Sequence, residues 1–544
     1  MLKKIKDNRF SIYFLSIIIV QIGVIIFFGS KKGGLALDEI WTFNLSNSYY
    51  FPFLGDASKY FNVMLEKNFF ADHLHVKEGV EFSYDSVFYN QSKDVHPPLY
   101  YILIHTLCSI VKSDNFKWLG VGLNIPFFIG IQYFILKIVN FISEDKKISL
   151  WVCAFYGFSL GAVSTVLYIR MYALLTLLSV IALYLNIQLM KKIINKLDFE
   201  KKDFFVFFGI FFTYLLGFLT QYYFLIFGFF LSLFVGVFVI FHAGIKKASI
   251  YALATILPIL VGVGIFPASI EHTIGGGYRG AEAINNIKNK SFLIEIGEFL
   301  KLLNIDTYFI YFAISIFILA VIYSFKNNGI KSFFNVSCFK RIFGGSLSFG
   351  FISYFIVFFV LLFSFLVISK IAAFREPRYI YYLYPLVFIL IVPSFYYFAS
   401  NFIKIRGLLW VFLFSIILFC SFLSLDASKM KHMFLKEQSV INNLKNKFHV
   451  KTIIAVTEKK KWWPVTSSIR FLKEFEYSYL TMPSDIYLLD YDFDDSIAVL
   501  IDRRLKNHEE ILGSFKFYKS IQLIKEVERN KYQYYLYKLY LLQK

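Results

Sequence analysis

Eleven long apolar runs constrain this chain more than any other feature of its sequence. A hydrocarbon core about 30 Å thick is crossed by a helix of about 20 apolar residues, and each run approaches or exceeds that length. The runs occupy residues 10–29, 118–142, 149–167, 171–189, 204–219, 222–241, 250–266, 308–325, 347–369, 379–398 and 407–425. Of the 544 residues, 57% are hydrophobic and only 17% are charged, which is more apolar than a water-soluble domain needs. The sequence therefore predicts a mainly α-helical, polytopic membrane protein with about 11 spans.

A twelfth apolar run, residues 97–111, is shorter, begins with Pro97-Pro98 and carries His105. Its length fits either a span or an interfacial helix, and the charge of the loops decides between them. If it does not cross and the N-terminus is inside, the inner loops are 143–147, 191–203, 242–247, 326–341 and 404–406. Four of these five are distinctly basic, as the positive-inside rule requires. We therefore expect 97–111 to lie in or dip into the outer interface.

The formal charge of +20 is spread over short lysine and arginine clusters between apolar runs. That arrangement is typical of cytoplasmic loops and disfavours binding to nucleic acid. The four cysteines lie in or near apolar stretches, so no disulfides are expected. The basic N-terminus precedes a run long enough to span the bilayer, which favours an uncleaved first helix over a signal peptide.

This topology leaves three polar segments outside the membrane, residues 30–115, 267–306 and the chain after Asp426. We expect residues 1–425 to form the transmembrane domain and residues 426–544 a small extracytoplasmic α/β domain. Within the C-terminal domain, the pattern of apolar and polar residues predicts five short strands and two helices. The expected strands are 452–456, 486–489, 497–501, 522–525 and 532–540, with helices after Trp463-Pro464 and near 502–512.

An acidic pair, Asp38-Glu39, follows the first span directly. Carboxylates beside lipid are costly and often mark a functional site, but the pair alone fits equally well an N-cap in which Asp38 starts an interfacial helix over 40–44. The balance shifts because other unusual polar residues converge on the same face. They are Asp94, His96, Arg170, Tyr172, Gln221, His272, Arg279, Arg375, Arg378 and Tyr379.

Four arginines thus lie at outer span ends, where the positive-inside rule makes them least expected. They are Arg170, Arg279, Arg375 and Arg378. Arginine presents a rigid fork of donors that matches phosphate. The pattern predicts an anion site facing a carboxylate, suited to transfer chemistry in which the acid takes a proton and the cations hold a departing phosphate. Any single arginine could instead anchor to lipid headgroups.

A metal site is a weaker possibility. Asp72, His73, His75 and Glu78 include a His-x-His pair, but no second cluster of ligands accompanies it. The run Gly275-Gly276-Gly277 lacks the remaining residues of a phosphate loop. We therefore expect no metal and no cofactor.

In several motifs the chain resembles the membrane glycosyltransferases of the GT-C fold, in particular bacterial relatives of protein O-mannosyltransferases and of aminoarabinose transferase. The resemblance extends in order over most of residues 35–385. The motifs are Asp38-Glu39, His96-Pro97-Pro98-Leu99-Tyr100-Tyr101, Arg170-Met171-Tyr172-Ala173-Leu174, Tyr278-Arg279-Gly280, Arg378-Tyr379 and Tyr384-Pro385. The family fold implies a cavity under the first outer loop and often a soluble C-terminal domain.

The resemblance also implies residue roles and a donor. The donor would be a polyprenyl-phosphate-linked monosaccharide, Asp38 the base with Glu39 beside it, and Asp94 the candidate for a second carboxylate. Many relatives have histidine where this chain has Gln221, so no acid-base role passes to that position. The expected substrate-binding residues are His96, Tyr100, Arg170, Tyr172, Arg279, Arg375, Arg378 and Tyr379.

These observations together predict an inverting glycosyltransferase in a bacterial cytoplasmic membrane, with its N-terminus inside and its C-terminal domain outside. Its partners would be the lipid-linked donor, a glycan, lipid or protein acceptor, and the bilayer. Two other functions stay open: an O-antigen-type polysaccharide polymerase, and a transporter or flippase of an anionic lipid. A transporter is expected to carry charges on broken helices at mid-membrane and to show repeated halves, and the sequence shows neither.

Overall fold

The computed structural model describes most of the chain and divides it into two compact units. The described residues are 2–51, 57–143, 145–195, 204–274, 278–326, 349–435, 437–458, 460, 466, 468–489, 494–526 and 537–544. The helical unit comprises Met1–Phe28, Val95–Leu99 and Val121–Met430. The mixed unit comprises Gly29–Asp94, Tyr100–Gly120 and Lys431–Lys544.

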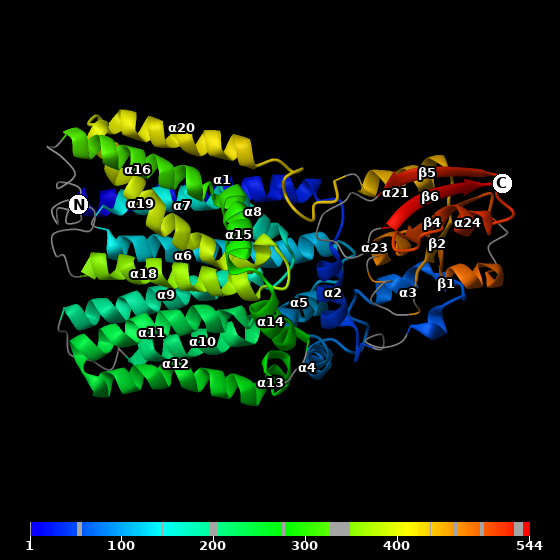
Figure 1. The fold of residues 1–544 in the computed structure, drawn as a ribbon, viewed down its shortest axis with the longest axis horizontal. Coiled ribbons are helices and arrows are strands. Elements are labelled where there is room, and N and C mark those ends of the chain that lie inside the picture. The colour runs from blue at the N-terminus through cyan, green and yellow to red at the C-terminus, as the bar shows by residue number, and fades with distance from the viewer. Residues whose placement is uncertain are drawn as a thin grey trace. The chain divides into compact units, whose positions relative to one another are not determined.

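The helical unit is built mainly from long apolar helices (Figure 1). Its elements are α1 (Leu2–Lys31), α6 (Phe116–Ile142), α7 (Lys146–Gly157), α8 (Leu160–Leu167), α9 (Tyr172–Ile194), α10 (Phe204–Thr220), α11 (Tyr223–Ala243), α12 (Ile245–Ile265), α13 (Ala268–Thr273), α14 (Tyr278–Asn289), α15 (Phe292–Thr307), α16 (Phe309–Lys326), α18 (Phe349–Ile371), η4 (Pro377–Leu383), α19 (Tyr384–Phe402) and α20 (Arg406–Ser424). In the described residues, eight helices are long and apolar enough to cross a membrane, or up to ten if each bent pair counts as one span. The chain thus has the makeup of a multi-pass membrane protein.

Three of the eleven predicted runs differ from a single long helix. The run 149–167 is a pair, α7 and α8, bent by 60°. The bend has a local cause, because the Ser159 side chain accepts a hydrogen bond from Ala162 N at 3.2 Å and so caps a new helix. The run 308–325 is α16, which meets α15 at 82° through Tyr308 in the left-handed conformation. The run 204–219 is α10, one of the shorter apolar helices.

Burial within the helical unit is uneven. The segment Pro377–Phe402 consists of η4 and α19, and 83% of its most apolar 18-residue stretch is buried inside the protein. The corresponding share in α9 is 72%. In α20 it is 22% and in α12 28%. Helices α9 and α19 therefore form the centre, whereas α12 and α20 present most of their side chains outward, as lipid-facing helices do.

The mixed unit combines short helices with one six-stranded sheet (Figure 1). Its elements are α2 (Leu37–Asn47), η1 (Ser58–Tyr60), β1 (Leu65–Glu66), α3 (Lys67–Asp72), α4 (Tyr84–Lys93), α5 (Leu99–Ile110), α21 (Glu437–Lys447), β2 (Thr452–Val456), α23 (Ile469–Leu472), β3 (Tyr477–Thr481), η5 (Pro483–Leu488), β4 (Ser496–Asp502), α24 (His508–Gly513), β5 (Ser520–Glu526) and β6 (Tyr537–Gln543). The strand order is β1-β3-β2-β4-β6-β5. Strands β3, β2 and β4 are parallel, and the other pairings are antiparallel.

The strands predicted at 452–456, 497–501 and 522–525 are confirmed as β2, β4 and β5. The strand predicted at 486–489 is wrong, because Pro483 opens a 3-10 helix there. The strand predicted at 532–540 is confirmed over 537–540, which belong to β6. Residues 532–536 lie outside the described residues, and so does Trp463-Pro464, after which a helix was expected. The helix expected near 502–512 is present as α24.

Two strands were not predicted from the sequence. Strand β3 lies between β2 and the edge of the sheet, and β1 pairs with it antiparallel, with Leu65 opposite Ser478. Strand β1 comes from the first polar segment, about 400 residues earlier in the chain than β3. The first polar segment and the C-terminal residues therefore share one sheet.

The run 97–111 contains α5, whose 12 residues correspond to about 18 Å of helix. That is shorter than a hydrocarbon core of about 30 Å. The helix is among the shorter apolar helices rather than the candidate spans.

Candidate functional site

The acidic pair of the mixed unit lies in the first turn of α2, and its two members differ. Helix α2 begins at Leu37 after the N-cap residue Ala36, so the alternative in which Asp38 is the N-cap is wrong. Glu39 provides the capping contact, because Ala36 N donates to Glu39 Oε2 at 2.6 Å. Glu39 is fully buried and pairs with Lys32 through an Nζ–Oε2 distance of 3.0 Å.

Asp38 is half-buried, in contrast to its neighbour. Its backbone oxygen accepts a hydrogen bond from the Thr42 hydroxyl at 2.9 Å, within the helix. The first turn of a helix favours a carboxylate because it carries a partial positive charge. Glu39 is held as a structural group, so Asp38 is the member of the pair that can serve chemistry.

Asp94 and Tyr100 also belong to the mixed unit. Asp94 ends α4, where its backbone N–H donates to Gln91 O at 3.1 Å, and its side chain is half-buried. The Tyr100 ring is completely buried in α5 and packs edge-to-face on Tyr101, with centroids 6.4 Å apart. This ring therefore supports the packing of α5, and its predicted substrate contact stays a prediction.

In the helical unit, Arg378 lies at the centre of a buried polar group. Its Nε is 2.6 Å from Glu376 Oε2, and its Nη1 donates to the Tyr168 hydroxyl at 2.6 Å. The guanidinium carbon lies 5.1 Å from the centre of the Tyr379 ring, a cation–π distance. Segment η4 places these groups, since every residue of Pro377–Leu383 is buried.

Tyrosine rings from three other segments meet around η4. Tyr168 and Tyr172 stack with centroids 5.9 Å apart and planes at 14°, and Tyr223 meets Tyr379 edge-on at 5.4 Å. Arg170, in the turn before α9, is buried, and its Nη2 lies 3.3 Å from His96 Nε2. We call this set the arginine–tyrosine cluster: Tyr168, Arg170, Tyr172, Tyr223, Arg378 and Tyr379. The structure thus brings together four of the eight predicted substrate-binding residues, with His96 beside them.

Arg279 lies on α14, and its Nη1 pairs with Glu282 Oε2 at 2.6 Å. Its guanidinium carbon is 5.7 Å from the Phe374 ring centre, and about a third of its side chain is exposed (35%). The next residue, Gly280, explains how α14 packs: a Cβ there would lie 2.2 Å from Thr273 O at the end of α13. Glycine is therefore required where α14 meets α13.

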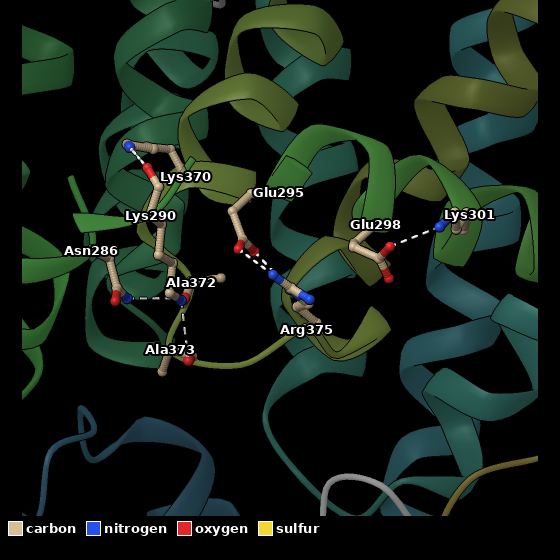
Figure 2. A network of polar contacts seen from close by, with 9 residues as sticks. All are labelled: Asn286, Lys290, Glu295, Glu298, Lys301, Lys370, Ala372, Ala373 and Arg375. Carbon is tan, nitrogen blue, oxygen red and sulfur yellow. Dashed lines mark hydrogen bonds and ion pairs between the residues drawn. The ribbon is translucent and has the colours of Figure 1, made fainter. Parts of the chain in front are cut away.

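Arg375 is the last of the four predicted arginines, and its contacts are shown in Figure 2. Its Nε and Nη2 bind the Glu295 carboxylate at 3.1 and 2.7 Å, a bidentate pair in which Glu295 is buried. Beside it, Lys290 Nζ donates to Ala372 O at 2.7 Å. Lys370 donates to Lys290 O, and the Asn286 amide donates to Ala372 O at 3.1 Å. Asn286 and Lys290 satisfy the Ala372 carbonyl just after α18, and Lys370 of α18 donates to the Lys290 carbonyl after α14, so these contacts fix the end of α14 to the end of α18.

Sequence reasoning missed the acidic partners. Three of the four predicted arginines are paired with a glutamate, namely Glu282, Glu295 or Glu376. Glu282 could have been found as the i+3 neighbour of Arg279 on a helix, whereas Glu295 is 80 residues from Arg375 and has no sequence signal.

The turn with Gln221 was also only partly predictable. Gln221 Oε1 accepts from Tyr222 N at 2.6 Å, so this amide stabilises its own turn. The imidazole beside the turn belongs to His272, whose Nδ1 lies 3.0 Å from the Tyr222 hydroxyl.

The described residues contain no group of three or more His, Cys, Asp or Glu side chains placed to hold a metal ion. The two histidines of the His-x-His pair have different surroundings. His73 is buried against Phe69, with ring centroids 4.8 Å apart, and burial lowers the pKa of its imidazole to about 3. His75 Nε2 lies 2.9 Å from Asp114 Oδ1.

Comparison with known proteins gives no further constraint on the site. No protein-family model matches the chain, and no curated protein shows significant similarity to it.

Proposed function

We propose that this protein is an inverting glycosyltransferase that moves a monosaccharide from a polyprenyl-phosphate donor to an acceptor hydroxyl on the extracytoplasmic face of the membrane. The observation that carries the proposal is the arginine–tyrosine cluster with Arg279 nearby in the same helical unit. Guanidinium groups bind phosphate oxygens, and tyrosine rings supply both hydroxyl donors and flat apolar faces for a sugar or an isoprenoid chain.

The glutamate partners do not remove this capacity. A guanidinium carries several N–H donors in a planar fork, and Arg279 uses only Nη1 on Glu282. Glu282 fixes the orientation of Arg279, and Glu376 fixes that of Arg378. Binding groups are commonly held in place by such supporting contacts. A phosphate added to such a site would meet cations already in place, at little further cost in side-chain entropy.

The proposed reaction needs one carboxylate and one anion site. Asp38 removes the proton of an acceptor hydroxyl, whose oxygen attacks the anomeric carbon on the face opposite the phosphate. The carbon–oxygen bond to the polyprenyl phosphate breaks, and the arginines stabilise the departing charge. Because no carboxylate forms a covalent bond to the sugar, the anomeric configuration inverts.

Loop charge supports the proposed orientation. The cluster residues lie at or just before the starts of α9, α11 and α19, whereas Lys191 and Lys192 lie in the last turn of α9, and Lys246 and Lys247 in the first turn of α12. Lysines at the end opposite the cluster are expected on the cytoplasmic side.

Single cysteines test this orientation in a background without the native cysteines. Cysteine in place of Ser113 is expected to react with a membrane-impermeant thiol reagent in intact cells. Cysteine in place of Asn195 is expected to react only after the membrane is opened. The reverse labelling at both positions would contradict the orientation.

A second candidate, transport of an anionic lipid, is favoured by the two bent helix pairs. Broken helices form substrate sites in many transporters. At the bend between α15 and α16, Asp306 is buried and accepts a hydrogen bond from the Tyr384 hydroxyl at 2.6 Å. An intramembrane carboxylate of this kind is a possible ion-coupling group.

The test between the two uses membranes from cells that express the protein and from cells that do not. Each is supplied with a panel of polyprenyl phosphates carrying different radiolabelled monosaccharides. A transferase is expected to convert one donor into a labelled product that no longer partitions as polyprenyl phosphate. Movement of intact donor across the membrane without a product would support the transporter instead.

A further inference from the structure

The mixed unit contains a pocket of about 320 Å³ that the reaction above does not use. Its walls come from six parts of the unit: the chain after α1, helix α2, the chain after α3, the start of α6, the first half of α21 and the region of α23. The volume lies at the lower end of the range for small-molecule sites, about 300–1,000 Å³. The charged side chains that line it are Lys32, Asp114, Lys117, Glu437, Arg470, Lys473 and Glu474.

One wall depends on two glycines. Gly33 N donates to Met433 O at 2.8 Å, and a Cβ on Gly33 would lie 2.3 Å from Phe434 O. A Cβ on Gly34 would lie 2.5 Å from Glu437 Oε2. Lys32 Nζ donates to His432 O at 2.7 Å, which ties the same two segments together. The wall is therefore closely packed, and the pocket is part of the fold of this unit.

Arg470 provides the strongest sign of a ligand. Its side chain is only 7% exposed, with Nη2 3.2 Å from Glu437 Oε1 and the guanidinium 4.4 Å from the Phe434 ring centre. Among the residues that the structure describes, its Nε has no hydrogen-bond partner. A buried donor without a partner is costly, so an acceptor is expected at this position.

Two further groups at the pocket favour an anion. Lys117 Nζ donates to Lys32 O at 2.8 Å, and this half-buried lysine has no carboxylate within ion-pair distance among the described residues. It lies in the first turn of α6, a 27-residue helix that has no acidic residue in that turn. The partial positive charge of a helix N-terminus adds to that of the lysine.

Other lining groups are suited to hydroxyls. Glu474 pairs with Lys473 at 2.7 Å, and both side chains are about a quarter exposed. Gln438 and Asn115 add amide groups that both donate and accept. A ligand with one negative group and several hydroxyls would satisfy both halves of the pocket.

We infer that this pocket binds an anionic saccharide, a sugar unit that carries a phosphate or a carboxylate. The anion would contact Lys117, Arg470 and the start of α6, and the hydroxyls would contact Glu474, Gln438 and Asn115. The binding of this saccharide does not depend on the proposed function. Its identification as part of the acceptor does rest on that function.

Calorimetric titration of the full-length protein in detergent tests the binding. The probes are glucose 6-phosphate, glucuronate, glucose and inorganic phosphate. Comparison of the first two shows whether the pocket prefers a phosphate or a carboxylate on the sugar. One charged sugar is expected to bind at least about tenfold more tightly than glucose and than inorganic phosphate. Equal binding of all four probes, or none, would overturn the inference.

Variants locate the binding site. Lys117→Gln is expected to weaken the binding of the charged sugar about tenfold, and Lys451→Gln, an exposed lysine outside the pocket, is expected to leave it unchanged. Arg470→Gln is expected to weaken it further, but it also leaves Glu437 buried without its cation, so Lys117→Gln decides the test. Unchanged binding in Lys117→Gln would overturn the assignment.

The donor assay separates this inference from the proposed function. Loss of saccharide binding in Lys117→Gln together with an unchanged transfer rate would show that the pocket does not hold the acceptor. Saccharide binding by a protein that converts no donor would sustain the pocket and contradict the transferase.

Discussion

The ion pair beside α2 in the mixed unit and two arginine–glutamate pairs in the helical unit differ in how far they are exposed. In the mixed unit, Lys32 and Glu39 are 1% and 0% exposed, so neither can leave its partner without a large desolvation cost. In the helical unit, Arg279 is 35% exposed and Arg375 42% exposed while each contacts a glutamate. A half-open pair keeps donors available to a ligand, whereas the Lys32–Glu39 pair is closed on both sides and stabilises the fold. The pair of Arg378 with Glu376 is nearly closed as well, at 11% and 3% exposed, so Arg378 keeps fewer donors for a ligand than Arg279 does. On this basis we propose a structural role for Glu39 and a binding role for Arg279, although the sequence predicted a functional role for both residues.

The largest expected effect is on the closed pair. Glu39→Ala is expected to lower the free energy of unfolding by about 3–5 kcal/mol, because it leaves the Lys32 ammonium buried without a counter-charge. Glu282→Ala, which removes the partner of the half-open Arg279, is expected to cost at most about 1 kcal/mol. Thermal unfolding of the purified variants in one detergent measures both. Equal destabilisation would remove the distinction between closed and half-open pairs.

The double variant Lys32→Met, Glu39→Leu sharpens this test. Replacement of both charges by apolar side chains is expected to recover most of the stability lost in Glu39→Ala. A double variant as unstable as the single one would show that the helix cap, and not the buried charge, dominates.

The next effect concerns the half-open Arg279. Arg279→Ala is expected to reduce donor kcat/KM by about 10- to 100-fold, since a charge-assisted bond contributes about 1.5–3 kcal/mol. Arg279→Lys is expected to recover only part of this, because lysine lacks the planar fork. Lys301→Ala serves as the control, because Lys301 is 70% exposed and pairs with Glu298 on the same helix. Full activity of Arg279→Ala would argue that this arginine only anchors the protein to lipid headgroups.

A further effect is a pH dependence of stability in the mixed unit. Burial lowers the pKa of His73 to about 3 from an ordinary value of 6.5. Between these values the unfolded chain binds the proton and the folded chain does not, so stability falls as the pH is lowered below about 6.5. His73→Phe is expected to reduce the slope of stability against pH in this range. An unchanged slope would show that His73 is not the group responsible.

Several parts of the molecule could be predicted from the sequence, for identifiable physical reasons. Long apolar helices follow from run length alone, and β2 and β4 follow from short β-branched runs such as Thr452–Val456. The bends at Ser159 and Tyr308 were not predictable, because one capping side chain and one left-handed residue divide runs whose hydropathy is continuous.

Contacts between distant segments account for the other misses. Strand β1 has two residues, and only its pairing with β3 defines it. The Glu295 contact of Arg375 and the Lys32 contact of Glu39 likewise depend on the fold. Residue types therefore indicated which side chains were unusual, but only their partners separated structural from functional roles.

The central claim is that Asp38 is the base of a sugar transfer from a lipid phosphate. It is tested most directly by purified wild-type and Asp38→Asn proteins in liposomes that contain the active polyprenyl-phosphate sugar, with released polyprenyl phosphate measured over time. Asp72→Asn, a change in an exposed acid of the same unit, is the matched control. We predict that wild type and Asp72→Asn release polyprenyl phosphate at similar rates and that folded Asp38→Asn is slower by about two orders of magnitude or more. Release by Asp38→Asn at the wild-type rate would contradict the account.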